Sequence, residues 1–142
     1  MSHMAKIELE IKDLAALKAA VNNLGYEFME NQETYAWYGR FVGDAPLPDG
    51  ISIDELGKCS HAIKVPDCSY EIGVVRKGAG YILLWDYWSA GGLSKVIGNN
   101  GGILKQAYAV ERIRREARLK NYSYREKVLP NNTIQISLGV RT

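Results

Sequence analysis

The chain has 142 residues, of which 46% are hydrophobic and 24% are charged, values typical of globular domains and not of disordered chains. No apolar stretch approaches the roughly 20 residues of a membrane-spanning helix, and the N-terminus lacks the pattern of a signal peptide. Two cysteines are too few for a disulfide framework. The sequence therefore predicts one soluble cytoplasmic domain over residues 1–142, without a membrane partner.

The charges are divided unevenly along the chain. Residues 1–71 contain 6 Lys+Arg and 12 Asp+Glu, a balance of −6, whereas residues 72–142 contain 12 Lys+Arg and 4 Asp+Glu, a balance of +8. Such asymmetry indicates an anionic partner or head-to-tail self-association. The alternative is that the two halves neutralise each other within one fold.

The first half opens with a strand and a helix. Residues 6–11 alternate between charged and apolar side chains, as a half-buried strand does. A helix over residues 14–24 follows, because Asp13 suits its N-cap and Gly25 its C-cap. Aromatic residues then predict strands at 26–28 and 34–42, before a proline-containing loop at 44–50 and a helical turn at 53–56.

The second half is dominated by two hairpins and a long helix. A short strand is expected at 61–65, and strands at 70–77 and 81–88 flank the glycine turn 78–80. A short helix at 93–97 and a long helix at 103–120 precede a second hairpin, 122–129 with 133–138. This order predicts the α+β class: an antiparallel sheet with two main helices packed on one face, related to the ferredoxin-like sandwich.

The strand at 81–88 contains one anomalous residue. Both of its faces are largely apolar, which predicts a central strand covered on both sides, yet Asp86 lies between Leu84 and Trp88. A buried carboxylate needs a partner, and Arg114 of the long helix is the candidate, for Asp86 or for Glu71. The alternatives are a cap at the frayed strand end, or a ligand-binding or catalytic role.

The long helix carries two stripes at helical spacing. The first is apolar and is expected to face the core: Ile103, Ala107, Val110, Ile113 and Ala117. The second mixes apolar and cationic residues: Leu104, Tyr108, Arg112, Arg115 and Leu119. It is interpreted either as a solvated face or as a contact surface, because Tyr and Arg are common interface anchors.

Known site motifs are scarce. The glycines at 91–92 and 101–102 could cradle an anion before the long helix, but no phosphate-loop pattern is present, which favours simple turns. Cys59, His61 and Cys68 match no usual zinc pattern, so neither a metal site nor a cofactor is expected. Tyr122 and Tyr124 lie among cations, but a pI near 8.5 argues against a dedicated nucleic-acid binder.

The order of several short motifs resembles a known family. These are the opening Met1-Ser2-His3, the helix ending at Leu24-Gly25-Tyr26, the hairpin residues 70–73 with Asp86-x-Trp88, and the helix segment 104–108. Together they resemble the uncharacterised conserved-frame family of plastid, cyanobacterial, other bacterial and phage genomes, a domain of unknown function. The resemblance implies a small intracellular phage or bacterial accessory protein, and it implies no catalytic residues.

Three functional hypotheses follow. The first is a non-enzymatic binding or regulatory protein, a homo-oligomer or the binder of a protein partner, which uses Tyr108, Arg112, Arg115 and exposed aromatic residues. The second is a pocket for a small anionic ligand such as a nucleotide, in which Arg76, Arg112 or Arg115 meets phosphate and Trp85 or Trp88 stacks on the base. The third is a hydrolase-type enzyme that uses Asp86, Glu71 or His61.

Overall fold

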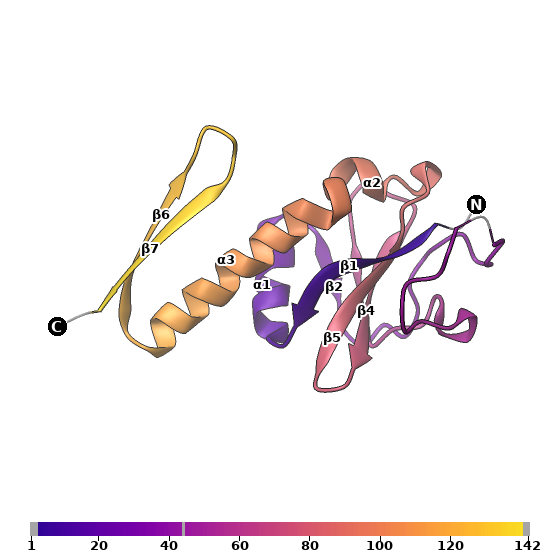
Figure 1. Cartoon of the computed structure of the whole chain (residues 1–142), viewed down its shortest axis with the longest axis horizontal. Helices are drawn as coiled ribbons and strands as arrows, with labels where there is room; N and C mark the ends of the chain where they lie inside the picture. The colour runs from indigo at the N-terminus through magenta and orange to yellow at the C-terminus, as the bar shows by residue number, and fades with distance from the viewer. Residues whose placement is uncertain (1–2, 44, 141–142) are drawn as a thin grey trace.

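The computed structural model describes residues 3–43 and 45–140, and its centre is a five-stranded antiparallel sheet (Figure 1). The strand order is β1-β5-β4-β3-β2. The strands are β1 (Met4–Ile11), β2 (Glu27–Met29), β3 (His61–Lys64), β4 (Glu71–Lys77) and β5 (Gly80–Asp86). The sheet has one strand more than a ferredoxin-like sandwich, and its first two strands, β1 and β2, form the opposite edges.

Two main helices cover one face of this sheet. They are α1 (Leu14–Asn23) and α3 (Gly102–Leu119), which pack against each other and against the sheet, and the short α2 (Leu93–Val96) precedes α3. Their apolar residues meet alternate sheet residues in the main core, which includes Leu17 of α1, Leu104 of α3, and Val74 and Leu83 of the sheet. The predicted α+β class, with an antiparallel sheet and both helices on one face, is confirmed.

A long loop covers the opposite face of the sheet. Between β2 and β3 the chain forms a 3₁₀ turn, Ile53–Glu55, and a second core in which Tyr35, Ile51 and Leu56 pack on Leu84. The prediction of a strand at 34–42 is wrong, because this segment makes only the isolated bridge between Thr34 and Lys58. Its aromatic residues pack from a loop, so aromatic content alone misled the strand assignment.

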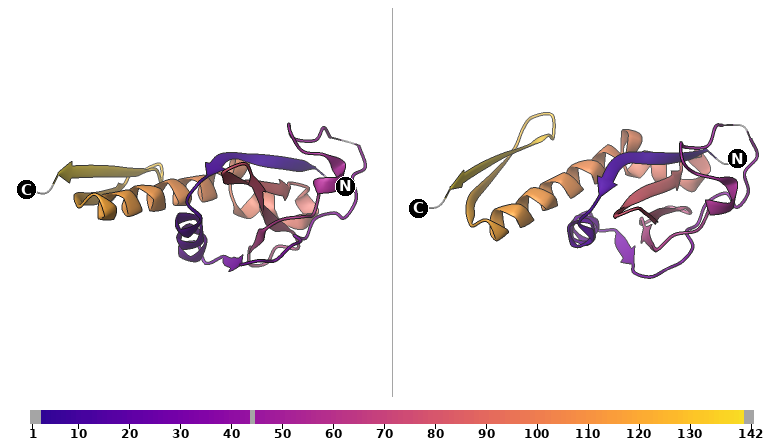
Figure 2. Two further views of the ribbon diagram at one scale, coloured as in Figure 1. Left: turned by 90° about the horizontal axis from the view of Figure 1, so that it is seen from below. Right: turned by 60° about the horizontal axis from the view of Figure 1, so that its bottom comes forward.

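The C-terminal hairpin forms a second sheet of its own. Its strands are β6 (Tyr122–Val128) and β7 (Ile134–Val140). Figures 1 and 2 show it at one end of the molecule, beyond the five-stranded sheet and beside α3. The side chain of Gln106 on α3 donates a hydrogen bond to the Asn132 carbonyl in the hairpin turn, at 3.3 Å, so the hairpin folds back along the helix.

The acidic and basic halves neutralise each other only in part. Among the described residues, two ion pairs join the two halves: Lys77 with Glu55, and Arg115 with Asp13. The other pairs lie within one half, as Lys18 with Glu30 does. The basic half therefore keeps an excess of positive charge at the surface. In the part of the chain that the structure describes, no helix is long and apolar enough to cross a membrane.

Candidate functional site

Asp86 is a fully buried carboxylate that binds backbone groups. It accepts hydrogen bonds from the backbone N–H groups of His3 at 3.0 Å, Tyr38 at 3.2 Å and Trp88 at 3.0 Å. The three donors come from the start of the chain, the long loop and the turn after β5. The prediction that Arg114 neutralises Asp86 or Glu71 is wrong, and the geometry gives Asp86 a structural role in joining three segments.

The two tryptophans near Asp86 lie in different surroundings. Trp85 is buried in the main core beneath a hollow of about 370 Å³, which Lys6, Tyr87 and Ser94 also line. Trp88 is half-buried, and its ring lies at 60° to the His3 ring with the ring centroids 5.5 Å apart. Trp85 is therefore mainly a core residue, and Trp88 belongs to a cluster with the N-terminal segment.

Arg76 lies away from the other predicted phosphate-binding residues. Its guanidinium stands over the Tyr81 ring at 5.9 Å from the centroid, and the residue lines a hollow beside Asp54 and Glu55. Arg112 and Arg115 line a different hollow, beside α1. The structure thus does not assemble Arg76, the tryptophans and the helix arginines into one nucleotide pocket.

Tyr108 and Arg115 fasten α3 to the start of α1. Tyr108 is buried, and its hydroxyl accepts hydrogen bonds from the backbone N–H groups of Lys12 and Asp13, each at 3.3 Å. Arg115 donates to the Asp13 carboxylate at 2.7 Å, and the same carboxylate caps α1 by accepting from Ala16 N–H. The prediction that Tyr108 belongs to an outer contact face is wrong, because the residue is part of the main core.

The pKa of Asp13 is affected by its place between the first turn of α1 and Arg115. Burial raises the pKa of the carboxyl, but the Ala16 N–H and the Arg115 guanidinium together outweigh burial, so that the pKa lies below its usual value. The negative charge at the N-terminus of α1 also agrees with the helix dipole. Asp13 is thus a structural anion, and it partly neutralises Arg115.

The two stripes of α3 face different partners from those expected. Leu104 and Tyr108 of the second stripe lie in the main core, whereas Ile103 of the first is 45% exposed. Val110 is buried, and it lies one turn from Gln106 and one turn from Arg114, both of which bind the hairpin. The assignment of the first stripe to the core is therefore only partly right: Ala107 packs against the main core, whereas Val110 and Ala117 are buried on the hairpin side of α3.

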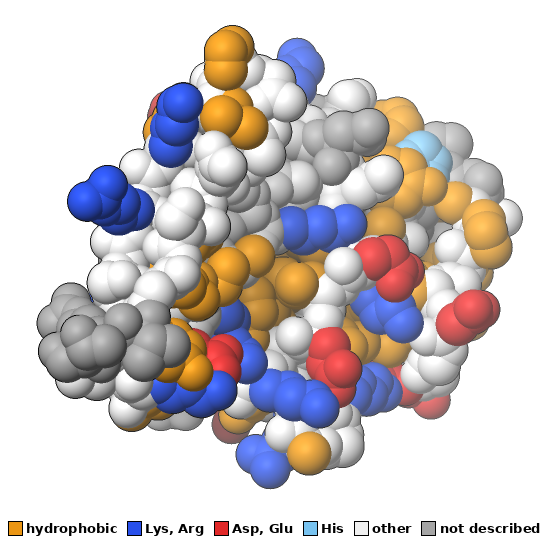
Figure 3. Space-filling view, turned by 60° about the vertical axis from the view of Figure 1, so that its left-hand side comes forward, with side chains coloured by type: hydrophobic (Ala, Val, Ile, Leu, Met, Phe, Trp, Pro, Cys, Tyr) orange, Lys and Arg blue, Asp and Glu red, His pale blue; other side chains and the backbone are white. Residues whose placement is uncertain are grey.

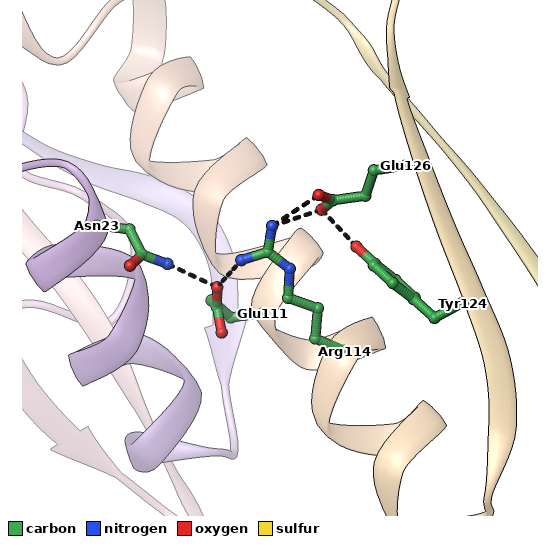
Figure 4. Close-up of polar contacts among 5 residues, drawn as sticks. All are labelled: Asn23, Glu111, Arg114, Tyr124 and Glu126. Carbon is green, nitrogen blue, oxygen red and sulfur yellow. Dashed lines mark hydrogen bonds and ion pairs between the residues drawn. The ribbon is translucent and has the colours of Figure 1, made fainter.

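A polar network fixes the hairpin to the helices (Figure 4). Glu111 of α3 is buried and accepts hydrogen bonds from the Asn23 amide at 2.7 Å and from Arg114 at 2.5 Å. Arg114 also binds both carboxylate oxygens of Glu126 on β6 at 2.7 Å, and the Tyr124 hydroxyl donates to Glu126. These bonds lower the pKa of Glu126, and the network connects α1, α3 and β6.

Sequence reasoning did not identify this network. Glu111 and Glu126 come from different elements, and neither belongs to a recognisable motif. The one available signal was Glu111 beside the apolar stripe of a helix, where a carboxylate needs a cationic partner. Arg114, three residues further on, supplies that partner.

The glycines before α3 serve as turns and as points of close packing. Gly101 has a φ of +72°, and a Cβ there would lie 2.8 Å from the Ile7 side chain. At Gly91 a Cβ would lie 2.0 Å from the Tyr70 ring. Both positions are thus explained by packing and backbone conformation, as the preference for simple turns predicts.

The remaining candidate is the surface that we call the arm, residues 112–140, which comprises the last turns of α3 and the hairpin. The arm contains seven Lys+Arg and two Asp+Glu. Of these cations, Arg112, Arg118, Arg125 and Lys127 form no ion pair within the described residues. In Figure 3, Lys and Arg side chains surround hydrophobic ones on the face that includes the hairpin.

Two hollows flank the end of α3 on the arm. One of about 380 Å³ is lined by Arg118, Asn121, Tyr122 and Tyr124 together with Arg114 and Ala117. The other, of about 470 Å³, lies toward α1 and includes Arg112, Arg115, Leu119 and Lys120. Leu119 stands at this end of the helix with 83% of its surface exposed. Cationic side chains and an exposed leucine thus lie together at this end of α3.

The residues proposed for acid–base chemistry bind separate backbone segments. Glu71 accepts from Ala36 N–H at 2.9 Å, and His61 Nδ1 accepts from Asn31 N–H at 2.9 Å. Burial lowers the pKa of His61, which favours its neutral form. Within residues 3–43 and 45–140, no group of three or more His, Cys, Asp and Glu is placed to hold a metal ion.

No protein-family model matches the sequence, and comparisons with curated proteins and with solved structures find no similar protein. The resemblance to the conserved-frame family therefore stays a prediction. The functional conclusion depends on the geometry of this chain alone, and above all on the arm.

Proposed function

We propose that this is a non-enzymatic binding protein, and that the arm recognises an acidic segment of a protein partner. The observation that carries the proposal is the combination at the end of α3: Arg112 and Arg118 form no ion pair among the described residues, and Leu119, next to Arg118 in sequence, is exposed. Tyr122 and Tyr124 add aromatic surface beside Arg118. Arg and Tyr anchors around an apolar residue favour a protein partner.

A nucleic-acid partner is less consistent with this surface. Nucleic-acid interfaces are strongly positive and polar, because phosphate contacts provide most of their affinity. The arm instead exposes Leu119, Val128 and Leu138, of which Val128 is 66% exposed. A partner that offers both carboxylates and apolar side chains covers more of this surface than a phosphate backbone does.

Three labelled probes of equal length distinguish these partners by fluorescence anisotropy: a peptide of alternating Glu and Leu pairs, polyglutamate, and oligothymidylate. The mixed peptide is expected to bind most tightly, because it alone satisfies the cations and Leu119 together. Equal binding of polyglutamate would mean that charge alone determines the affinity. Tighter binding of oligothymidylate would contradict the proposal and indicate a nucleic-acid partner.

Matched variants locate the site. Arg112→Glu with Arg118→Glu should weaken binding of the mixed peptide by about tenfold or more, which is about 1.4 kcal/mol. Lys58→Glu with Lys64→Glu makes the same charge change at exposed positions of the body and should have little effect. Equal losses in both variants would show that net charge, and not the arm, governs binding. Leu119→Ser should weaken the mixed peptide and leave polyglutamate unchanged.

A small anionic ligand is the second candidate, and the hollow beside Arg118 is the observation that favours it. Its volume of about 380 Å³ lies in the range of small-molecule sites, and Tyr122 and Tyr124 could flank a base. A nucleotide at one hundred times its Kd would stabilise the protein by about 2.7 kcal/mol and raise its Tm by several degrees. Thermal shift with nucleoside triphosphates tests this, and Arg118→Ala should abolish the shift. A shift that persists in Arg118→Ala, or none at all, would exclude this hollow.

A further inference from the structure

We propose that two copies of the chain associate through the outer edge of β7, in antiparallel register about a two-fold axis, to form the continuous four-stranded sheet β6-β7-β7-β6. The occupant of this edge is the same strand of a second copy. The proposal is independent of the acidic partner, because it concerns the free edge of the hairpin and not the cationic end of α3.

The first observation is the open backbone edge of β7. Within the described residues β7 is hydrogen-bonded to β6 alone. Leu129 N–H donates to the Thr133 carbonyl at 2.8 Å, and Val128 pairs with Ile134. Alternation along an antiparallel pair then directs the N–H and C=O groups of Ile134, Ile136 and Leu138 away from β6. These are the groups that a further strand would bind.

The second observation is that, among the sheet edges in the part of the chain that the structure describes, β7 alone has both the length and the composition for pairing. Native proteins protect free edges with charges or with short strands. The β1 edge carries Lys6, Glu8 and Glu10, the β2 edge is three residues long, and β6 contains Arg125, Glu126 and Lys127. The seven residues of β7, IQISLGV, contain neither a charge nor a proline. Two such strands meet without electrostatic repulsion.

The third observation is the incomplete cover of the apolar face of the hairpin. Tyr124 pairs with Leu138, and Val128 with Ile134, so that these side chains lie on one face. Yet 66% of Val128 and 48% of Leu138 remain exposed. An isolated two-stranded sheet is only marginally stable in water, and either a packed helix or further strands with an apolar face stabilise it. Pairing of β7 with its copy doubles the sheet and extends that face across the axis.

Two charge substitutions on β7 are expected to keep the hairpin folded and to prevent the association of the two copies. Gln135 and Ser137 lie opposite Lys127 and Arg125 in the hairpin. Gln135→Glu with Ser137→Glu therefore places each new carboxylate beside a cation within one copy, and this favours the hairpin. Across the two-fold axis the same carboxylates face each other and repel, so the pair should dissociate.

Sedimentation equilibrium measures the outcome. Wild-type protein should approach twice 15.9 kDa as its concentration rises, and the Gln135→Glu, Ser137→Glu variant should remain at 15.9 kDa with an unchanged circular-dichroism spectrum. The control Arg125→Gln with Lys127→Gln makes the same net charge change on β6 and should still form dimers. Monomeric wild-type protein at all concentrations would overturn the proposal. If the glutamate variant dimerises like wild type, or if the control also dissociates, the two copies do not associate through β7.

A second measurement excludes association elsewhere on the molecule. Amide exchange should show concentration-dependent protection at Ile134, Ile136 and Leu138, and not at Gln135 and Ser137, whose amides already bind β6. Protection of none of these amides in the dimer would assign the contact to another surface. Peptide binding by the monomeric glutamate variant then tests the acidic partner separately, so that failure of one proposal is distinguishable from failure of the other.

Discussion

At the scale of single residues, a substitution of Asp86 tests whether this residue has a structural or a binding role. Both of its carboxylate oxygens accept backbone N–H groups, so an asparagine in its place would turn an NH₂ group toward at least one N–H. Asp86→Asn should therefore lower the free energy of unfolding by about 2–4 kcal/mol in urea denaturation. The exposed Asp49→Asn serves as the control and should change it by less than about 0.5 kcal/mol. Full stability with loss of peptide binding would instead identify Asp86 as a binding residue.

Asp13 gives a pH-dependent prediction. The pKa of this carboxyl is lower in the folded protein than in the unfolded chain, so its stabilisation is complete above the unfolded value of about 3.9 and is lost as the pH falls through the lower pKa of the folded state. Asp13→Asn keeps a capping oxygen and removes the charge. The variant should be less stable than wild type by about 1 kcal/mol at neutral pH, and the difference should shrink as the pH falls below about 4. Urea titrations at both pH values measure it.

The control for this prediction is Glu10→Gln. Glu10 pairs with Lys12 at 3.6 Å, with both side chains largely exposed, and an exposed pair of this kind contributes little. A pH-independent difference for Asp13→Asn would mean that the carboxyl is not preferentially ionised in the folded protein.

Individual residues were only partly predictable from the sequence. The Asp13 cap follows from local chemistry, because its donor lies three residues away. The burial of Asp86 follows from strand alternation, but its donors do not: His3 and Tyr38 are 83 and 48 residues distant. Backbone N–H groups carry no signature in the sequence, so an arginine was the natural but mistaken choice of partner.

At the scale of secondary-structure elements, α3 shows how one helix can have two apolar faces. Leu104 is fully buried in the main core and Ile103 is 45% exposed. Leu104→Ala should cost about 3 kcal/mol of unfolding free energy, because it removes buried contacts and leaves a cavity. Ile103→Ala should cost less than about 1 kcal/mol. Chemical denaturation of this adjacent pair checks the orientation, and the reverse order would restore the orientation expected from the sequence.

The elements themselves were predictable where local signals agree. Alternation predicted β1, caps predicted α1, and the glycine turn predicted the hairpin of β4 and β5. The segment 34–42 failed because Tyr35 and Trp37 contribute apolar area to a core without strand pairing. The orientation of α3 failed because both of its stripes are partly apolar, and its partners on the two sides are distant in sequence.

At the scale of the whole molecule, the uneven charge reflects the position of the arm. The positive excess of the second half gathers on α3 and β6, which extend beyond the sheet, while Asp13 and Glu55 provide the two ion pairs between the halves. The composition reveals the excess of positive charge, but it does not reveal that these charges lie together on the arm. That arrangement depends on the bonds of Arg114 and Gln106 to the hairpin, which no local pattern encodes.

The same arrangement predicts a gradient of local stability. The strands β4 and β5 are each paired on both sides and covered on both faces, so their amides should exchange only by global unfolding. The hairpin is held by the Glu111–Arg114–Glu126 network, by Gln106 and by one partly covered apolar face. In the monomeric glutamate variant, the amides of β6 and β7 that bond to each other should therefore exchange at least about 100-fold faster than those of β4 and β5. Hydrogen exchange followed by NMR measures both sets at once. Equal rates would mean that the hairpin unfolds together with the body, and that the network transmits the full stability of the core to the arm.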